Sequence, residues 1–236
     1  MATDCLFRDD SYLRHCDATV VGITDQGLVL DRTVFYANSG GQPGDRGVLR
    51  TDAGDITVET AVFTDAGKTE IAHALPADVA PPPPGVRVGA AIDWNTRYRR
   101  MRMHTALHLL SAALPFPVTG GSVGDAEGRL DFDIPEAGLD KDEITRKLAA
   151  LIAADLAVST RWITDEELAA NPSLVKTMSV KPPMGTGRVR LVEIAGCDLQ
   201  PCGGTHVRRT GEIGAVRVTG IEKKGKLNRR VRLAFA

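Results

Sequence analysis

Two pairs of potential metal ligands lie far apart in the sequence. His104 and His108 belong to the segment His-Thr-Ala-Leu-His, and Cys202 and His206 belong to the segment Cys-Gly-Gly-Thr-His. Side chains four residues apart on a helix share one face, so the two imidazoles of the first pair can bind one ion. The second pair adds a thiolate and an imidazole on a glycine-rich segment that can turn tightly around a metal. Nitrogen and sulfur ligands together favour zinc over magnesium or calcium, so the sequence predicts a Zn2+ site formed by these four residues.

Four protein ligands leave two interpretations open. Such a set usually encloses a structural zinc ion, whereas a catalytic zinc ion keeps one position for water or substrate. A metallopeptidase helix carries Glu directly after its first histidine, but position 105 is Thr, which disfavours that class. No serine or cysteine stands beside a free histidine, so a covalent nucleophile is not expected. A zinc hydrolase without a covalent intermediate and a non-catalytic module with a structural zinc both fit these residues.

The elements that must position these residues point to two domains. With 236 residues, of which 43% are hydrophobic, the chain can bury two cores, and we place the boundary after Asp93. Residues 1–93 contain short β-rich pieces between turn residues, which predict a small β-barrel. Residues 94–236 predict an α+β domain in which helices over 96–114 and 141–156 pack on a largely antiparallel sheet. The strands are expected at 18–23, 27–30, 47–50 and 56–62 in the first domain and at 130–134, 157–163, 188–194, 214–221 and 228–235 in the second.

The net charge of −1 conceals an asymmetry between these domains. Residues 1–93 hold 7 Lys and Arg against 14 Asp and Glu, a net charge of −7, whereas residues 94–236 hold 22 against 16, a net charge of +6. A polyanion is therefore expected to meet the second domain. No apolar run is long enough to span a bilayer, the N-terminal segment is acidic, and four cysteines are too few for a disulfide framework. We expect a cytoplasmic protein in a reducing compartment, with no membrane contact.

Four separated segments together resemble the AlaX family. They are Phe35–Gly47 (FYANSGGQPGDRG), Arg102–Leu110 (RMHTALHLL), Asp198–Val207 (DLQPCGGTHV) and Ile221–Val231 (IEKKGKLNRRV). The family comprises free-standing relatives of the alanyl-tRNA synthetase editing domain, and the chain is similar to its medium-length form with an extra N-terminal domain. The resemblance implies that this N-terminal part is a barrel like those of translation factors, in agreement with the β-rich pieces.

The same resemblance implies an activity, a substrate and a cofactor. The activity is that of a trans-acting aminoacyl-tRNA deacylase, and the substrate is tRNA(Ala) mischarged with serine or with glycine. The implied cofactor is Zn2+ held by His104, His108, Cys202 and His206, and no obligatory protein partner is evident. A zinc hydrolase of free amino-acid esters is a third interpretation, in which basic residues would have no role.

The resemblance also suggests roles for polar residues outside the ligand set. Thr105 is expected to hydrogen-bond the seryl hydroxyl, because a site that binds a hydroxyl rejects the analogue that lacks it. The alternative is that its hydroxyl bonds only within its own helix. Asp198 is expected to orient a ligand imidazole, unless it is an exposed loop carboxylate. Gly40, Gly41 and Gln42 are expected to close over the aminoacyl end, unless their segment is an ordinary tight loop.

Basic residues gather in two places where phosphate contacts are expected. The first cluster, at the start of the histidine helix, contains Arg97, Arg99, Arg100 and Arg102; the second, near the C-terminus, contains Lys223, Lys224, Lys226, Arg229, Arg230 and Arg232. Lys and Arg supply salt-sensitive affinity for RNA that is largely independent of sequence, although a charge run is often only a solvated face. We expect the second cluster to contribute more, and we assign substrate binding to Arg102, Lys224, Asn228, Arg229 and Arg230.

Overall fold

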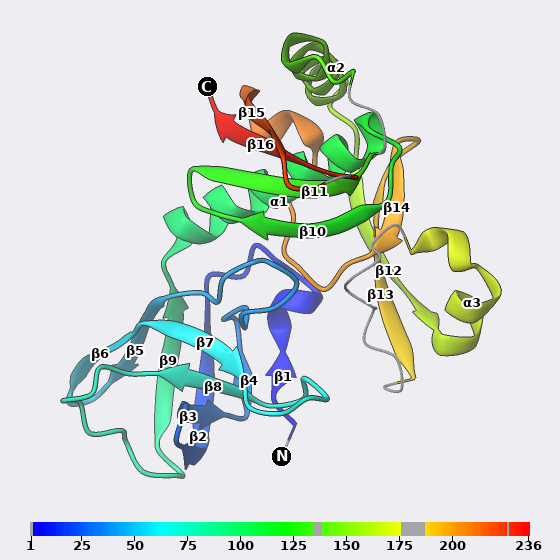
Figure 1. The fold of residues 1–236 in the computed structure, drawn as a ribbon. Coiled ribbons are helices and arrows are strands. Elements are labelled where there is room, and N and C mark those ends of the chain that lie inside the picture. The colour runs from blue at the N-terminus through cyan, green and yellow to red at the C-terminus, as the bar shows by residue number, and fades with distance from the viewer. Residues whose placement is uncertain (1, 135–137, 176–186, 226) are drawn as a thin grey trace. The chain divides into compact units, whose positions relative to one another are not determined.

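The computed structural model describes residues 2–134, 138–175, 187–225 and 227–236. The chain divides into two compact units, Met1–Tyr98 and Arg99–Ala236 (Figure 1). The division falls inside helix α1 (Trp94–Ala113) rather than after Asp93, because the first turn of α1 bonds to the first unit: Arg46 donates to Thr96, and Arg97 donates to Asp45. In the described residues, no helix is both long and apolar enough to cross a membrane.

The first unit is built on an antiparallel sheet of seven strands. Their order is β6 (Gly54–Val58), β5 (Gly47–Thr51), β9 (Arg87–Ile92), β2 (His15–Thr24), β3 (Gly27–Leu30), β8 (Ile71–Ala74) and β7 (Thr60–Phe63). A parallel pair, β1 (Asp4–Cys5) with β4 (Arg32–Thr33), and the 3-10 turn η1 (Leu6–Arg8) complete the unit.

The closed barrel expected for this unit is not confirmed. In the described part of the chain no ladder joins the two edge strands, β6 and β7. Only Glu59 separates them along the chain, and a single residue is too short for the hairpin loop that antiparallel pairing of consecutive strands needs. The amide of Glu59 bonds instead to the carbonyl oxygen of Ala74 on β8.

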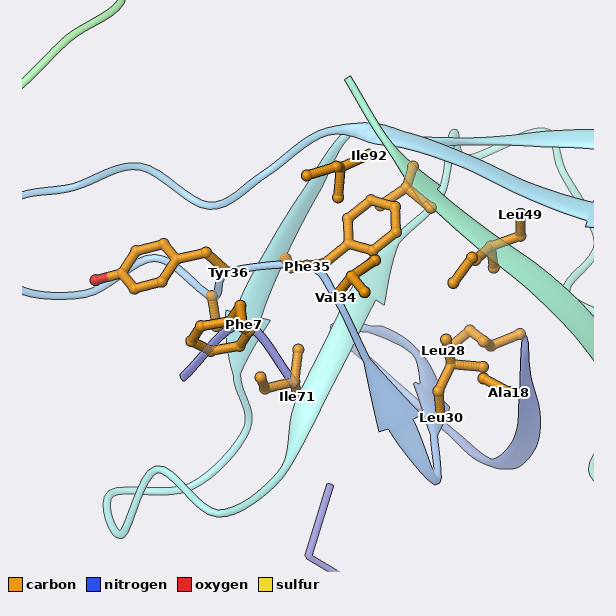
Figure 2. Close-up of a cluster of buried hydrophobic side chains, with 14 of the residues drawn as sticks. Phe7, Ala18, Leu28, Leu30, Val34, Phe35, Tyr36, Leu49, Ile71 and Ile92 are labelled. Carbon is orange, nitrogen blue, oxygen red and sulfur yellow. The ribbon is translucent and has the colours of Figure 1, made fainter. Parts of the chain in front are cut away.

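The hydrophobic core of the first unit fixes the approach to the glycine-rich segment. On β9, alternate residues point inward (Val88, Ala90 and Ile92), as expected for a strand with one buried face. Figure 2 shows the cluster that these strands enclose, which includes Phe7, Ala18, Leu28, Leu30, Val34, Phe35, Tyr36, Leu49, Ile71 and Ile92. Because residues 34–37 are buried in this cluster, the chain enters the glycine-rich segment from a rigid base.

His73 on β8 links the core to the residues that lead into the glycine-rich segment. Its Nδ1 lies 3.0 Å from the carbonyl oxygen of Leu28, and its Nε2 lies 2.8 Å from Oγ1 of Thr33. A carbonyl oxygen only accepts, so Nδ1 carries the proton and Nε2 accepts from the Thr33 hydroxyl. The same hydroxyl accepts from the amide of Phe35 at 3.0 Å. Burial lowers the pKa of His73 to about 4 against the opposing effect of the Leu28 carbonyl, so the ring is neutral at neutral pH.

We expect the free energy of unfolding of the first unit to decrease as the pH falls from 6.5 towards 4. The pKa of His73 is about 4 in the folded chain and 6.5 for an unperturbed histidine, so protons bind the unfolded chain first. The stabilisation is complete above pH 6.5, and about 3 kcal/mol is lost once the folded chain is also protonated. Urea unfolding at pH 7 and pH 4.5 should show a smaller loss for His73→Gln than for the wild type. The exposed His15 supplies the control, since His15→Gln should keep the wild-type loss; equal losses in all three proteins would contradict the assignment.

The second unit contains two antiparallel sheets and three α-helices among its described residues. One sheet has the order β10 (Val118–Val123), β11 (Glu127–Asp133), β16 (Asn228–Phe235) and β15 (Val216–Lys223), and the other has the order β12 (Val158–Thr164), β13 (Arg188–Ile194) and β14 (Asp198–Pro201). The helices are α1, α2 (Lys141–Ala153) and α3 (Asp165–Ala170), with 3-10 turns η2 (Pro172–Leu174) and η3 (Thr210–Ile213). The mixture of helices with antiparallel sheets agrees with the expected α+β class, although β10 and β14 were not predicted.

Helix α1 carries the histidine pair and packs against β11. At Gly128 of β11, an added Cβ atom would lie 2.8 Å from the Met103 side chain and 3.2 Å from that of Leu107. The missing side chain at Gly128 therefore lets the helix approach the sheet closely. Further along the unit, Nε of Arg102 donates to the carbonyl oxygen of Ile213 in η3 at 2.8 Å. These contacts hold the turn of α1 that carries the histidines.

Candidate metal centre

The two distant ligand pairs meet in the second unit. His104 and His108 lie one turn apart on α1, and Cys202 and His206 follow strand β14. One potential ligand atom from each of the four residues lies within 4.8 Å of the other three. The imidazole of His206 packs against both helical imidazoles, with its ring centroid 4.3 Å from that of His104 and 4.6 Å from that of His108.

The spacing of these atoms fits a zinc ion. Zinc–sulfur bonds of about 2.3 Å and zinc–nitrogen bonds of about 2.0 Å in a tetrahedron separate the ligand atoms by about 3.5 Å. Sγ of Cys202 lies 3.6 Å from Nε2 of His104 and 3.3 Å from Nε2 of His206. Three imidazoles and one thiolate also form a donor set that zinc prefers. The residues present can therefore hold the ion that the sequence predicts.

The charges in the cluster also suit a cation. Burial raises the pKa of the Cys202 thiol, but its interactions with the imidazoles of His104 and His206 outweigh burial and hold that pKa well below its usual value. Burial, and next the interaction with His104, lower the pKa of His206 to about 3. Burial also lowers the pKa of His108, but its hydrogen bonds with Asp198 and Cys202 prevail and raise it to about 9. A thiolate and neutral imidazoles are the forms that bind a metal, so binding would release the proton of His108.

Asp198 lies behind His108, away from the ligand cluster. Its Oδ2 lies 2.8 Å from Nδ1 of His108 and accepts from Nε2 of Gln200 at 2.7 Å. Nδ1 of His108 is thereby committed to the carboxylate, which leaves Nε2 for an ion. Asp198 is 5% exposed and Gln200 7% exposed, so neither is a loop residue in solvent. Gln200 was missed in the sequence, where Asp198, Gln200 and Cys202 alternate in the way that places residues on one face of a strand.

The hydroxyl of Thr105 is engaged inside the second unit. The residue is fully buried, and its Oγ1 donates to the carbonyl oxygen of Met101 at 2.9 Å. The same oxygen accepts from the amide of Val207 at 3.3 Å and lies 3.2 Å from Nδ1 of His206. One hydrogen and two lone pairs account for these three contacts when Nδ1 of His206 donates. Thr105 thus bonds within its own helix and also holds His206, and its hydroxyl is not exposed to a substrate in this conformation.

Known proteins resemble the chain over both units. The family described as Threonyl and Alanyl tRNA synthetase second additional domain matches residues 189–232, and the family described as tRNA synthetases class II (A) matches residues 10–96. Alanyl-tRNA editing protein AlaX-M of Methanosarcina mazei is 34% identical over an alignment of 241 positions, gaps included, which covers 97% of this chain and 95% of that protein. The protein of the same name from Methanosarcina acetivorans is 35% identical over 243 residues, which cover 97% of each chain. The chain belongs to the AlaX family.

Membership in the AlaX family confirms the resemblance given by the four motifs and the expectation of an enzyme. Alanyl-tRNA editing protein AlaX-L of Pyrococcus horikoshii is 32% identical over 236 residues, which cover 94% of this chain and 55% of that longer protein. The AlaX similarity thus extends across the first unit as well as the candidate ligand cluster.

The glycine-rich segment of this AlaX chain is a tight turn in the first unit, whereas the ligand cluster belongs to the second. Gly40 and Gly41 have φ values of 58° and 81°, which favour glycine. Ser39 and Gln42 exchange backbone hydrogen bonds of 3.1 and 2.9 Å across the turn, and Gln42 is fully buried. At Gly44, an added Cβ atom would lie 2.1 Å from the carbonyl oxygen of Ala61. These contacts account for the shape of the turn, and its part in substrate binding stays a prediction.

The first basic cluster of the AlaX chain is largely engaged within the protein. Arg97 is fully buried, Arg100 is 8% exposed, and Arg99 is exposed. Arg97 donates to Asp45, Arg100 to Asp125 and Arg102 to the carbonyl oxygen of Ile213. The guanidinium of Arg102 also lies 4.3 Å from the centre of the Phe235 ring. These side chains position helix α1, and only Arg99 of the four presents an exposed charge.

The expected substrate-binding residues of β16 also have partners within the sheet. Arg230 donates twice to Asp131 on β11, at 2.7 and 2.8 Å, and Nδ2 of Asn228 donates to Oγ1 of Thr119 at 2.6 Å. Arg229 is 7% exposed, because alternate residues of β16 face the core. These three residues therefore stabilise the four-stranded sheet.

Exposed positive charge remains at the end of β15. Lys223 and Lys224 are exposed, and Nζ of Lys224 lies 3.6 Å from Glu222 in a pair whose side chains are 44% and 40% exposed. Surface ion pairs of this kind contribute little to stability, so the lysine can readily leave its carboxylate partner and bind another anion. Lys226 lies outside the described residues. Of the residues assigned to substrate binding in the second unit, Lys224 is the exposed cation.

Proposed function

We propose that the chain hydrolyses the ester bond of tRNA(Ala) mischarged with serine, and also that of Gly-tRNA(Ala), in a zinc-dependent reaction in the cytoplasm. The observation that carries the proposal is the grouping of three imidazoles and one thiolate within 4.8 Å of one another in a member of the AlaX family. The exposed lysines at the end of β15 supply a surface to which tRNA phosphates can bind.

The roles proposed for the residues follow from their contacts. A bound zinc ion would supply a Lewis acid that polarises the ester and lowers the pKa of a water molecule. Asp198 holds the ring of His108, and Thr105 holds that of His206. Cys202 is partly exposed, whereas the three histidines are buried, so the ester is expected to approach on the side of Cys202. An aminoacyl ester is intrinsically labile, and holding it in the right geometry supplies much of the rate.

Deacylation of Ser-, Gly- and Ala-tRNA(Ala), before and after chelation and with zinc restored, tests the proposal. We expect Ser-tRNA(Ala) to be hydrolysed fastest and Ala-tRNA(Ala) to be spared, with activity lost on chelation and recovered with zinc. Binding of tRNA without turnover of any of the three would contradict deacylation and favour an RNA-binding module with a structural zinc. Equal rates on a free serine ester would favour a small-ester hydrolase.

Replacing Thr105 by valine separates its two possible roles. Because the Thr105 hydroxyl contacts His206 and is buried, we expect Thr105→Val to reduce kcat on Ser- and Gly-tRNA(Ala) by the same factor, about 10- to 100-fold. Thr105→Ser keeps the hydroxyl and should restore most of the activity. A loss confined to the seryl substrate would contradict positioning and show direct contact with the seryl hydroxyl.

Reversing the exposed lysines should weaken tRNA binding. The double variant Lys223→Glu, Lys224→Glu is expected to raise Kd and to reduce the slope of log Kd against log salt by about 1 for each phosphate that is no longer bound. Lys223 is a better choice than Arg229 for this test, because Arg229 faces the core of the sheet. Lys147→Glu on α2 is the control, since Lys147 is equally exposed and pairs with Glu143. Equal binding by both variants would exclude the end of β15 from the tRNA surface.

A further inference from the structure

One face of the β13–β14 hairpin carries a buried arginine beside the metal ligands. In the ladder, Val192 is paired with Gln200, and the amide of Cys202 continues the pairing by donating to the carbonyl oxygen of Arg190 at 3.0 Å. Residues directly opposite each other in antiparallel strands project on the same face. Arg190 therefore shares a face with Cys202, and it is 6% exposed.

The guanidinium of Arg190 binds the backbone of the ligand turn. Its Nη1 donates to the carbonyl oxygen of Cys202 at 3.0 Å and to that of Gly204 at 2.9 Å. A buried guanidinium is stable only where acceptors replace water, and these two carbonyl groups supply acceptors for Nη1. One nitrogen thus joins both ends of the Cys-Gly-Gly turn to strand β13.

The shape of this turn determines where the sulfur lies. The amide of Gly204 lies 3.4 Å from Sγ of Cys202 and faces the sulfur. The carbonyl oxygen of the same residue accepts from Arg190, so Gly204 is held on both sides. A Cβ atom added at Gly203 would meet no other atom within 4 Å, so the turn is open on that side. His206 follows two residues after Gly204, and the turn therefore sets the approach of both downstream ligands to the helical pair.

We propose that Arg190 is a positioning residue of the metal centre, which holds the Cys202–Gly204 turn so that the thiolate and His206 face His104 and His108 before an ion binds. Arg190 acts through the main chain, because its Nη1 donates to the carbonyl oxygens of Cys202 and Gly204. This inference rests on the proposed metal site, and it adds a residue that neither the ligand spacing nor the family motifs identify.

The test measures metal binding directly in the full chain. Zinc affinity is determined by competition with a chromophoric chelator, and the Co2+-substituted protein is examined for its sulfur-to-cobalt charge-transfer band. We expect Arg190→Met to weaken zinc binding by about 10- to 100-fold and to reduce or shift that band, as is typical of residues that orient metal ligands. Arg190→Lys keeps a cation but lacks the reach of the guanidinium, and it should fall between Arg190→Met and the wild type.

Arg161→Met is the matched control, since Arg161 lies in the same three-stranded sheet in a surface pair with Glu193 whose side chains are 53% and 44% exposed. It should bind both metals like the wild type. Wild-type affinity and an unchanged cobalt band in Arg190→Met would overturn the proposal. If Arg190→Met does not fold, Arg190→Lys decides alone, and its equality with the wild type in both measurements would overturn the proposal. A wild-type protein that binds neither metal would instead refute the proposed function.

Discussion

Replacing Cys202 by alanine is expected to abolish both stoichiometric zinc binding and deacylation of Ser-tRNA(Ala). The thiolate is the only sulfur ligand in the cluster and lies within 3.6 Å of two imidazole nitrogens, so its removal leaves three of the four ligands and weakens metal binding. A Lewis acid supplies several kcal/mol of transition-state stabilisation, and loss of about 4 kcal/mol reduces the rate by about 1,000-fold. Zinc content by atomic absorption and kcat/KM for deacylation measure the two effects.

Cys197 provides a control for this substitution. It is also partly buried, lies in the turn between β13 and β14, and is not part of the ligand cluster. Cys197→Ala should therefore keep one zinc ion per chain and wild-type deacylation. Retention of full activity by zinc-free Cys202→Ala would show that the reaction does not need the metal.

The grouping of the four candidate metal ligands could be predicted because it depends on local spacing and on scarce residue types. His104 and His108 share a helix face at any point of a chain where that helix forms. Arg190 and Gln200 escaped prediction because their importance depends on strand β14, which the sequence did not reveal. When β14 pairs with β13, the alternating residues Asp198, Gln200 and Cys202 lie on one face of the hairpin. Arg190, which stands across from Cys202 on β13, projects on that same face.

The roles of the basic residues could not be read from the sequence, because their partners lie far along the chain. Asp131 lies 99 residues from Arg230, and Asp45 lies 52 residues from Arg97, so local charge patterns show neither pair. A run of arginines looks the same whether it faces RNA or a buried carboxylate. The same limit applies to the first unit, where strand pieces were found locally but closure of a barrel depends on which edges pair.

Replacing Arg97 by methionine is expected to destabilise the first unit by about 3 to 5 kcal/mol, because it leaves the carboxylate of Asp45 buried without its counter-ion. The side chains of Arg97 and Asp45 are 0% and 1% exposed. Oδ2 of Asp45 accepts from Nε of Arg97 at 2.9 Å and from the amide of Tyr36 at 2.7 Å, whereas Oδ1 has no hydrogen-bond partner among the described residues. Urea unfolding followed by the fluorescence of Trp94, in a Trp162→Phe background, reports on the first unit.

A double-mutant cycle identifies the cause of this destabilisation. Asp45→Asn removes the buried charge, so adding it to Arg97→Met should recover part of the stability, and the two changes should not be additive. Arg32→Met is the surface control: Arg32 pairs with Asp31 at 3.7 Å, but the side chains are 51% and 35% exposed, so we expect a decrease below about 1 kcal/mol. If Arg97→Met cost no more than Arg32→Met, the buried pair would not be what joins the glycine-rich segment to the first turn of α1. A large destabilisation that Asp45→Asn partly reverses would show that Arg97 stabilises the core of the first unit. The sequence had instead grouped Arg97 with neighbouring arginines that were expected to contact RNA.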